Sequence, residues 1–202
     1  MWPDDLEVVA VERDPKIAEV YRELYPQDIV IEEDAHYVLL HNHQDYDFIW
    51  SSPPCQSHSR MIRSGRNRKP RYPDLRLYEE ILLLQHDFKG KWIVENVVPY
   101  YTPLVPPEKR GRHLFWSNFY IPEFNPPEFK ADFINTTNVA GKKAMQDWLG
   151  IHYDKNIYYE GNHCPTQVLR NAVHPKIGKI IFEAAQEPTG REKQLGYEQN
   201  RQ

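Results

Sequence analysis

Short apolar runs alternate with amphipathic stretches along the first half of the chain. Four runs have the β-branched and aromatic content typical of strands: 6–12 (LEVVAVE), 28–35 (DIVIEEDA), 46–52 (YDFIWSS) and 91–97 (KWIVENV). Residues 14–26 and 75–88 place apolar side chains at helical spacing between these runs. Strands that alternate with helices predict an α/β fold, with a doubly wound and mostly parallel sheet covered on both faces.

The pattern changes after Pro99. Residues 99–129 are rich in proline and aromatic residues, so we expect loops and short strands there. Residues 141–150 (GKKAMQDWLG) predict a short helix, and the stretch from Pro175 to Gln186 predicts a last one. The remaining 188–202 form a polar tail, which we expect to be frayed.

The polar residues that end the predicted strands are the first candidates for a site. In open parallel sheets, ligands bind beyond the carboxyl ends of the strands. The residues at these positions are Glu12, Asp34, Cys55, Glu95 and Asn96.

Length and composition narrow the class of protein. A chain of 202 residues can bury a core without covalent staples, and it is expected to form a single domain. It has no apolar run long enough to cross a bilayer, and its first residues lack the pattern of a secretion signal, so we expect a soluble, intracellular protein with no membrane partner. Two cysteines without zinc-type spacing predict neither a disulfide framework nor a metal site.

Charge is distributed unevenly, although the net charge is only −4. The segment 58–76 holds one acidic residue, Asp74, and many basic ones; those proposed to contact DNA are Arg60, Arg63, Arg66, Arg68, Lys69 and Arg71. A run of this kind is either a solvated loop or a phosphate-binding surface. Its place directly after Cys55 favours phosphate contact.

Three motifs, taken in order and spacing, resemble the DNA (cytosine-5) methyltransferases. They are PPCQ at 53–56, ENV at 95–97 and RNAVHPKIGKIIFEA at 170–184. The resemblance covers residues 6–118 and 163–187. It implies a Rossmann-like methyltransferase fold with a catalytic core at 1–115, a small, irregular target-recognition region at 116–162, and a returning motif and helix at 163–187. It also implies a cytoplasmic enzyme of a bacterial or phage-infected cell.

The chemistry of this family explains why a thiol would follow two prolines. Carbon 5 of cytosine is a weak nucleophile, so an enzyme must first add its own nucleophile at carbon 6, and a thiolate suits that task. The prolines before Cys55 restrict the backbone and hold the thiol where a base can approach it. The alternative is that Cys55 is a small buried hydrophobic residue.

The resemblance gives roles to four neighbours of the thiol. Glu95 would neutralise the charge that develops on ring nitrogen 3, Asn96 would fix the cysteine loop and Pro54 would lie beside the base. Arg112, in preference to Arg110, would steady the base carbonyl or the closed loop. A salt-bridged glutamate and surface arginines are the alternatives.

The family's methyl donor is S-adenosylmethionine. Glu12 matches the acid that binds the ribose hydroxyls, and Asp34 matches the carboxylate that accepts from the adenine amino group. Both precede helix-like stretches, so each is alternatively a helix cap. Asn171 and Val173 belong to the segment that would close over the methionine end of the donor.

The sequence departs from the family in one major respect. The chain lacks the phenylalanine-x-glycine-x-glycine turn that cradles the donor, and its first run matches the family's second strand, so the usual first strand is missing. Three arrangements are open: a start upstream of Met1, which is the simplest, a second chain that supplies the piece, or a fold that no longer binds the donor. Serines before the prolines and Arg170 are smaller departures.

Two classes of function therefore remain. The first is an enzyme that methylates cytosine in double-stranded DNA, with RNA cytosine as a chemically equivalent substrate. The second is a methyltransferase-like protein that only binds DNA or a partner chain, alone or as one part of a split enzyme. The short target-recognition region predicts a short recognition sequence or low specificity. Within it, Lys142, Tyr153 and Lys155 are among the residues that could meet DNA.

Overall fold

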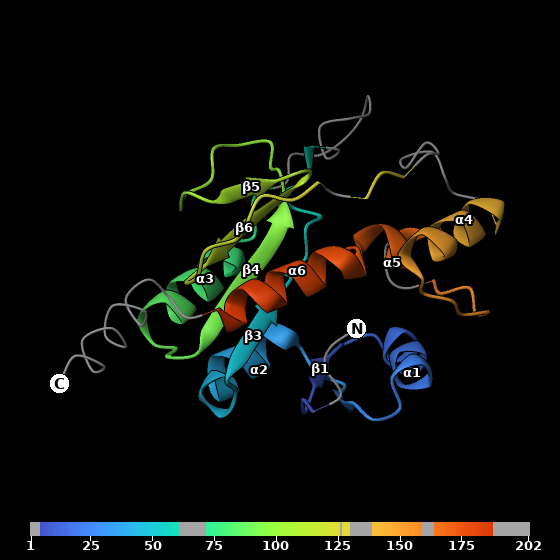
Figure 1. Cartoon of the computed structure of the whole chain (residues 1–202), viewed down its shortest axis with the longest axis horizontal. Helices are drawn as coiled ribbons and strands as arrows, with labels where there is room; N and C mark the ends of the chain where they lie inside the picture. The colour runs from blue at the N-terminus through green and yellow to red at the C-terminus, as the bar shows by residue number, and fades with distance from the viewer. Residues whose placement is uncertain (1–4, 61–71, 126, 130–138, 159–163, 188–202) are drawn as a thin grey trace. The chain divides into compact units, whose positions relative to one another are not determined.

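The computed structural model describes residues 5–60, 72–125, 127–129, 139–158 and 164–187 (Figure 1). The chain divides into two compact units. One consists of Met1–Ala35 and Pro127–Ile180, and the other of His36–Pro126 and Ile181–Gln202. The predicted division into 1–115, 116–162, 163–187 and 188–202 follows expected function and not compactness. It stays a prediction.

The first unit contains a short two-stranded parallel sheet. Strand β1 (Val9–Val11) pairs with β2 (Ile29–Ile31), and helix α1 (Pro15–Leu24) connects them. Asp14 caps this helix, because its side chain accepts from the backbone N–H groups of Lys16 and Ile17. Helices α4 (Val139–Leu149) and α5 (Gln167–Asn171) complete the unit together with the start of α6 (Pro175–Gln186).

The core of the first unit joins α1 to the segments after residue 140. Its buried members are Val20, Met145, Leu149, Tyr153, Ile157 and Leu169. Ion pairs on the surface connect the same elements, since Lys155 contacts Glu19 and Glu23 of α1. Residues distant in sequence therefore share one small hydrophobic core.

The second unit contains a four-stranded mixed sheet with the order β3-β4-β6-β5. Strand β3 (Phe48–Ser51) runs parallel to β4 (Lys91–Val97), whereas β6 (His113–Ser117) runs antiparallel to both β4 and β5 (Glu108–Arg110). The helical elements are α2 (Ala35–Asn42), the 3-10 turn η1 (His43–Asp45) and α3 (Arg76–His86).

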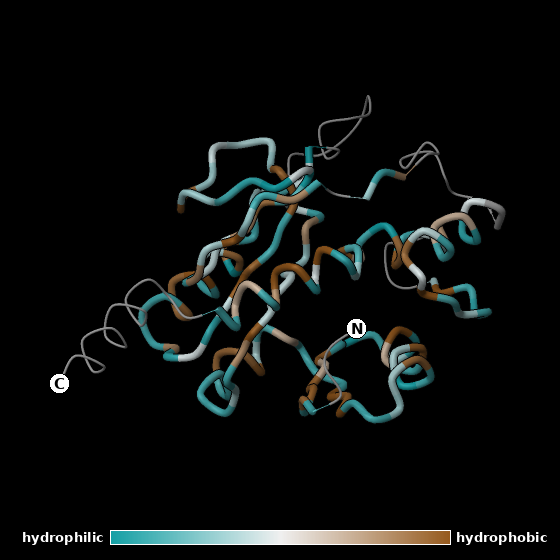
Figure 2. The backbone as a smooth tube through the Cα atoms, viewed as in Figure 1, coloured by the Kyte–Doolittle hydropathy of each residue, from teal (hydrophilic) through white to brown (hydrophobic). Residues whose placement is uncertain are grey.

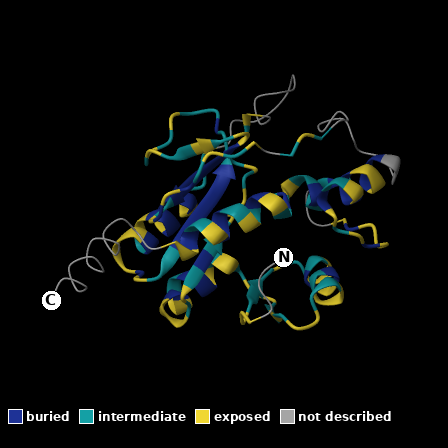
Figure 3. Cartoon of the chain, in the orientation of Figure 1, coloured by how far each residue is buried: buried dark blue, intermediate teal, exposed yellow. Residues whose placement is uncertain are grey.

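Both faces of this sheet are covered. Helix α3 packs on one face, where Leu77, Ile81 and Leu84 meet apolar residues of β3, β4 and β6. On the opposite face, Phe182 of α6 lies edge-on to Phe48, with the ring centroids 5.4 Å apart. Figure 2 shows apolar segments on β3 and α6, and Figure 3 shows β4 as a buried strand. A strand buried on both faces explains the nearly continuous apolar run of KWIVENV.

The chain is thus a mixed α/β protein, as its pattern predicts, but the expectation of a mostly parallel sheet is wrong. In the part of the chain that the structure describes, the strands form two small sheets, and two of the four strand pairs are antiparallel. One of the two antiparallel pairs is the tight hairpin between β5 and β6, and the other is formed by β6 and β4. Arg110 pairs with His113 across a two-residue loop, and Gly111 at its first position has a φ of 58°, which glycine adopts without strain.

In the described parts of the chain, no helix combines the length and the apolar character that crossing a bilayer requires. The expected frayed tail at 188–202 lies outside the described residues.

Candidate active site

Cys55 lies in the corner that follows β3. The strand ends at Ser51, and the chain passes through two prolines to a turn in which the Cys55 carbonyl accepts from the backbone N–H groups of His58 and Ser59, both at 3.0 Å. The cysteine is half-buried and Pro54 beside it is exposed. The thiol is therefore neither sealed in the core nor on a freely exposed loop.

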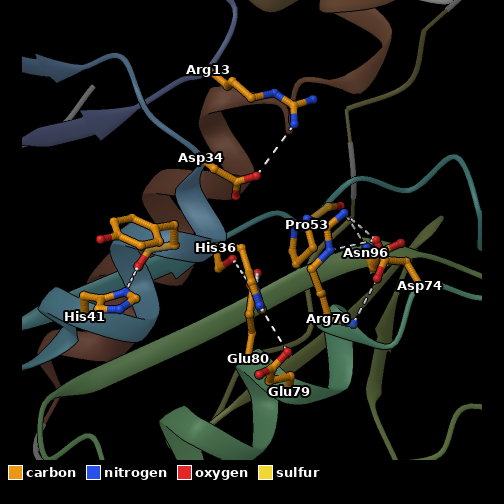
Figure 4. A network of polar contacts seen from close by, with 12 residues as sticks. Arg13, Asp34, His36, His41, Pro53, Asp74, Arg76, Glu79, Glu80 and Asn96 are labelled. Atoms are coloured by element: carbon orange, nitrogen blue, oxygen red, sulfur yellow. Dashed lines mark hydrogen bonds and ion pairs between the residues drawn. The ribbon is translucent and has the colours of Figure 1, made fainter.

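The corner is attached to the end of β4 at several points. Asn96, which is 2% exposed, donates from Nδ2 to the Pro53 carbonyl at 3.0 Å (Figure 4). Further along, Tyr100 N–H donates to the His58 carbonyl at 3.1 Å. Because β3 and β4 are parallel and Ser51 pairs with Val94, the chain leaves both strands at the same edge of the sheet. Cys55 and Glu95 are thereby held at neighbouring strand ends.

Glu95 is buried within the sheet and paired with a histidine. It is 6% exposed, and its Oε1 is hydrogen-bonded to Nδ1 of His113, which is 8% exposed. Glu95 lies opposite Phe115 in the antiparallel register, so His113 is its diagonal neighbour on the same face of the sheet. A carboxyl group is thus fixed at the end of β4, on the face that also bears Phe115.

The two arginines of the β5–β6 hairpin have different surroundings. Arg110 donates to the backbone carbonyls of Ile121 at 2.6 Å and Pro122 at 3.2 Å, so it anchors the following loop. Arg112 lies in the hairpin loop and is an exposed residue. Protein atoms around its guanidinium still displace water and lower its pKa, and the negative charges of Glu95 and Cys55 oppose this effect. The Arg112 guanidinium is therefore the one that interacts through its charge with the Cys55 thiol and the Glu95 carboxyl group.

The pKa of the Cys55 thiol depends on its burial and on two charged neighbours, Glu95 and Arg112. Burial raises the pKa of the Cys55 thiol, and the Glu95 carboxylate raises it further. A hydrogen bond from its own backbone and the charge of Arg112 lower it in turn. The net effect is an increase, so at neutral pH the free protein holds Cys55 as a thiol. Glu95 and Arg112 are therefore close enough to affect the ionisation of Cys55.

Two features near the site were missed by the sequence analysis. His113 follows the arginine motif directly, but its role depends on the antiparallel register of β6, which no sequence motif specifies. The second is a buried glutamate, Glu80, which is 3% exposed and accepts from Ser51 Oγ at 2.5 Å, while His36 Nδ1 lies 2.8 Å from its other oxygen (Figure 4). This network fixes the end of β3, immediately before the cysteine corner.

The residues predicted to bind the donor lie in the first unit. Glu12 follows β1, where its Oε1 accepts from Asp14 N–H at 2.7 Å and burial raises the pKa of its carboxyl group. Asp34 follows β2 and forms an ion pair with Arg13 at 3.6 Å (Figure 4). Because β1 and β2 are parallel neighbours, both acids lie at one edge of that sheet.

The third predicted donor element is at the end of α5. Asn171 is exposed, and its Oδ1 accepts from Gln167 at 2.8 Å, whereas Val173 is half-buried. The helix-cap alternative does not apply to Glu12, because Asp14 is the residue that caps α1.

The residues predicted to contact DNA are only partly described. Arg60 is exposed and donates from Nε to the Pro99 carbonyl at 3.2 Å. The other five, Arg63, Arg66, Arg68, Lys69 and Arg71, lie outside the described residues. In the recognition region, Lys142 and Tyr153 are buried, and Lys142 donates to the carbonyls of Asp154 and Lys155. Both side chains are therefore packed within this unit, and packing is the alternative to DNA contact for a tyrosine in this region.

Comparison with family models, with curated proteins and with solved structures found no match for this chain.

Proposed function

We propose that the chain is the catalytic part of a DNA cytosine-5 methyltransferase. The observation that carries the proposal is the placement of Cys55 and Glu95 at the same edge of two neighbouring parallel strands, where Asn96 ties the cysteine corner to β4. The charges of Glu95 and Arg112 both act on the Cys55 thiol. A nucleophile, an acid and a cation so arranged can act together on one planar ring. Double-stranded DNA would present the target base by flipping it out of the helix into this site.

Each residue has a defined part in the activation of cytosine. Cys55 loses its proton to solvent as the base approaches, and the thiolate sulfur forms a bond to carbon 6. Glu95 takes up a proton from solvent as the base enters, and it passes this proton to nitrogen 3 as the ring electrons move there. Arg112 contributes a positive charge that stabilises the thiolate before attack. The resulting enamine makes carbon 5 nucleophilic.

The acids of the first unit fit the donor that this chemistry requires. Glu12 and Asp34 provide carboxylate acceptors at one sheet edge, which suit ribose hydroxyls and an adenine amino group. When bound, S-adenosylmethionine would supply the methyl group. Asn171 and Val173 would contact its other end.

The decisive experiment measures cytosine activation without the donor. Addition of a thiolate at carbon 6 lets carbon 5 take a proton from water and release its own hydrogen, after which the thiolate leaves. DNA labelled with tritium at carbon 5 of cytosine should therefore release tritium into water in the presence of the chain. Cys55→Ser should abolish the release, and Cys164→Ser should retain it. Activity that survives Cys55→Ser would overturn the proposal.

A binding protein without catalysis is the second candidate, and one observation favours it. Burial and Glu95 raise the pKa of Cys55, so the resting thiol is a poor nucleophile. A protein of this class would bind DNA in a salt-dependent manner and release no tritium under any condition. Calorimetry with S-adenosylmethionine would then show whether the donor site is retained. The same assays on RNA labelled at cytosine carbon 5 test the alternative polymer.

A further inference from the structure

Among the described residues, His113 is the one that hydrogen-bonds the Glu95 side chain, and the strands around it hold the contact in place. The two residues lie on adjacent antiparallel strands, β4 and β6, and both are at least nine-tenths buried. The imidazole also packs beside Phe115, with the ring centroids 6.1 Å apart. The strand register and the packing hold the imidazole against one oxygen of the carboxyl group.

From this arrangement we infer that His113 is a positioning residue for Glu95, which fixes the oxygen that carries the proton toward the pyrimidine. The inference rests on the proposed function and deepens it. A buried carboxyl group with two free oxygens could rotate and place its proton on either one. The inference assigns His113 the tautomer that carries its proton on Nδ1, the nitrogen in contact with Oε1. That tautomer donates to Oε1 and so directs the acid proton to Oε2.

The proton balance of this step is complete. As the bond between the Cys55 sulfur and carbon 6 forms, the Oε2–H bond of Glu95 breaks and nitrogen 3 gains the proton. His113 keeps its own proton and donates to Oε1 before and after the transfer. When the sulfur leaves, the proton returns from nitrogen 3 to Oε2. A positioning residue of this kind contributes by geometry, and misplacement of a catalytic group costs about tenfold to a hundredfold in rate.

Two amide variants separate the positioning role from a merely structural one. Asparagine places an N–H donor where His113 has Nδ1, whereas glutamine places it where the imidazole has Nε2. Both are polar and similar in size, so both should fold, which circular dichroism can check. We expect His113→Asn to retain tritium release within about threefold, and His113→Gln to lose about tenfold to a hundredfold. Equal rates for the two variants would overturn the inference.

A second readout does not need DNA. The imidazole nitrogen chemical shifts of His113, measured by NMR, should report a protonated Nδ1 in the wild type and should change in Glu95→Gln. Unchanged His113 shifts in Glu95→Gln would also overturn the inference. Failure of the proposed function is recognised separately, because the wild-type chain would then release no tritium. That result would overturn the positioning role of His113 in catalysis as well, even if the NMR experiment showed its hydrogen bond to Glu95.

Discussion

Asn96 holds the cysteine corner through a single buried hydrogen bond to the Pro53 carbonyl, 3.0 Å long. The amide is 2% exposed, and its other end accepts from the N–H of Val97 at 2.9 Å. One side chain at the end of β4 thus contributes to fixing the path of the chain after β3. The position of Cys55 relative to Glu95 depends on this contact.

Substitution of Asn96 by alanine should disturb both stability and the site. It leaves the Pro53 carbonyl without its donor, so the free energy of unfolding should fall by about 1–3 kcal/mol. Asn118→Ala is the matched control, because Asn118 holds the opposite end of β4 through Trp92 and Gly90. Urea denaturation and alkylation of Cys55 should distinguish them. Only Asn96→Ala should change the alkylation rate of the folded protein, and an equal change in both would refute the role of Asn96.

The two cysteines should differ in reactivity. Burial alone would raise the pKa of Cys164, but hydrogen bonds from Thr166 and Arg170 outweigh it and lower the pKa, whereas the pKa of Cys55 is raised. At pH 7.5, iodoacetamide should modify Cys164 about tenfold faster than Cys55. Mass spectrometry of Cys55→Ser and Cys164→Ser, each with one remaining thiol, measures the two rates. Faster modification of Cys55 would show that its surroundings favour the thiolate.

The secondary structure was largely predictable from the pattern, and the tertiary arrangement was less so. The strand Lys91–Val97 coincides with the predicted run, because a strand buried on both faces has a continuous apolar sequence. The hairpin of β5 and β6 was expected only as loops and short strands, since proline obscures strand patterns. Its antiparallel pairing depends on Gly111 and the register it sets, and no apolar periodicity reveals that register.

The candidate site shows the same limit. Cys55, Glu95 and Arg112 were identified from motifs, and the structure places them within electrostatic reach of one another. His113 was missed because its contact with Glu95 follows from strand register, and Glu80 was missed because a glutamate within the polar pattern of a helix usually faces solvent. Motifs thus indicate reacting groups more readily than the residues that position them.

Acidification should destabilise the protein through His58. Burial lowers the pKa of this imidazole, and the nearby Asp74 only partly opposes the effect. The unfolded chain therefore takes up a proton first as the pH falls through about 6.5, so the free energy of unfolding decreases between that pH and the lowered folded-state pKa. Urea denaturation at pH 7.5 and 5.5 measures the slope. His58→Asn should reduce it and the exposed His41→Asn should not; equal slopes in His58→Asn and the wild type would contradict the assignment.

Substitution of Arg112 should change the reactivity of Cys55, whereas substitution of Arg110 should change the stability of the fold. Arg112→Gln removes the charge that lowers the pKa of Cys55, so alkylation of Cys55 should slow. Arg110→Gln should instead lower the free energy of unfolding by about 1–3 kcal/mol, because the Ile121 and Pro122 carbonyls lose their donor. Alkylation kinetics and urea denaturation of both variants provide the measurements. An unchanged Cys55 rate in Arg112→Gln would remove Arg112 from the site.

The most direct measurement of the central claim follows two rates in Glu95→Gln. Loss of the negative charge lowers the pKa of Cys55, so iodoacetamide should modify Cys55 in the free protein faster than in the wild type. Loss of the acid should at the same time slow tritium release from cytosine by about a hundredfold to a thousandfold. Opposite changes in the two rates are the predicted result. Tritium release at the wild-type rate in Glu95→Gln would contradict the claim that Cys55 and Glu95 act together on cytosine.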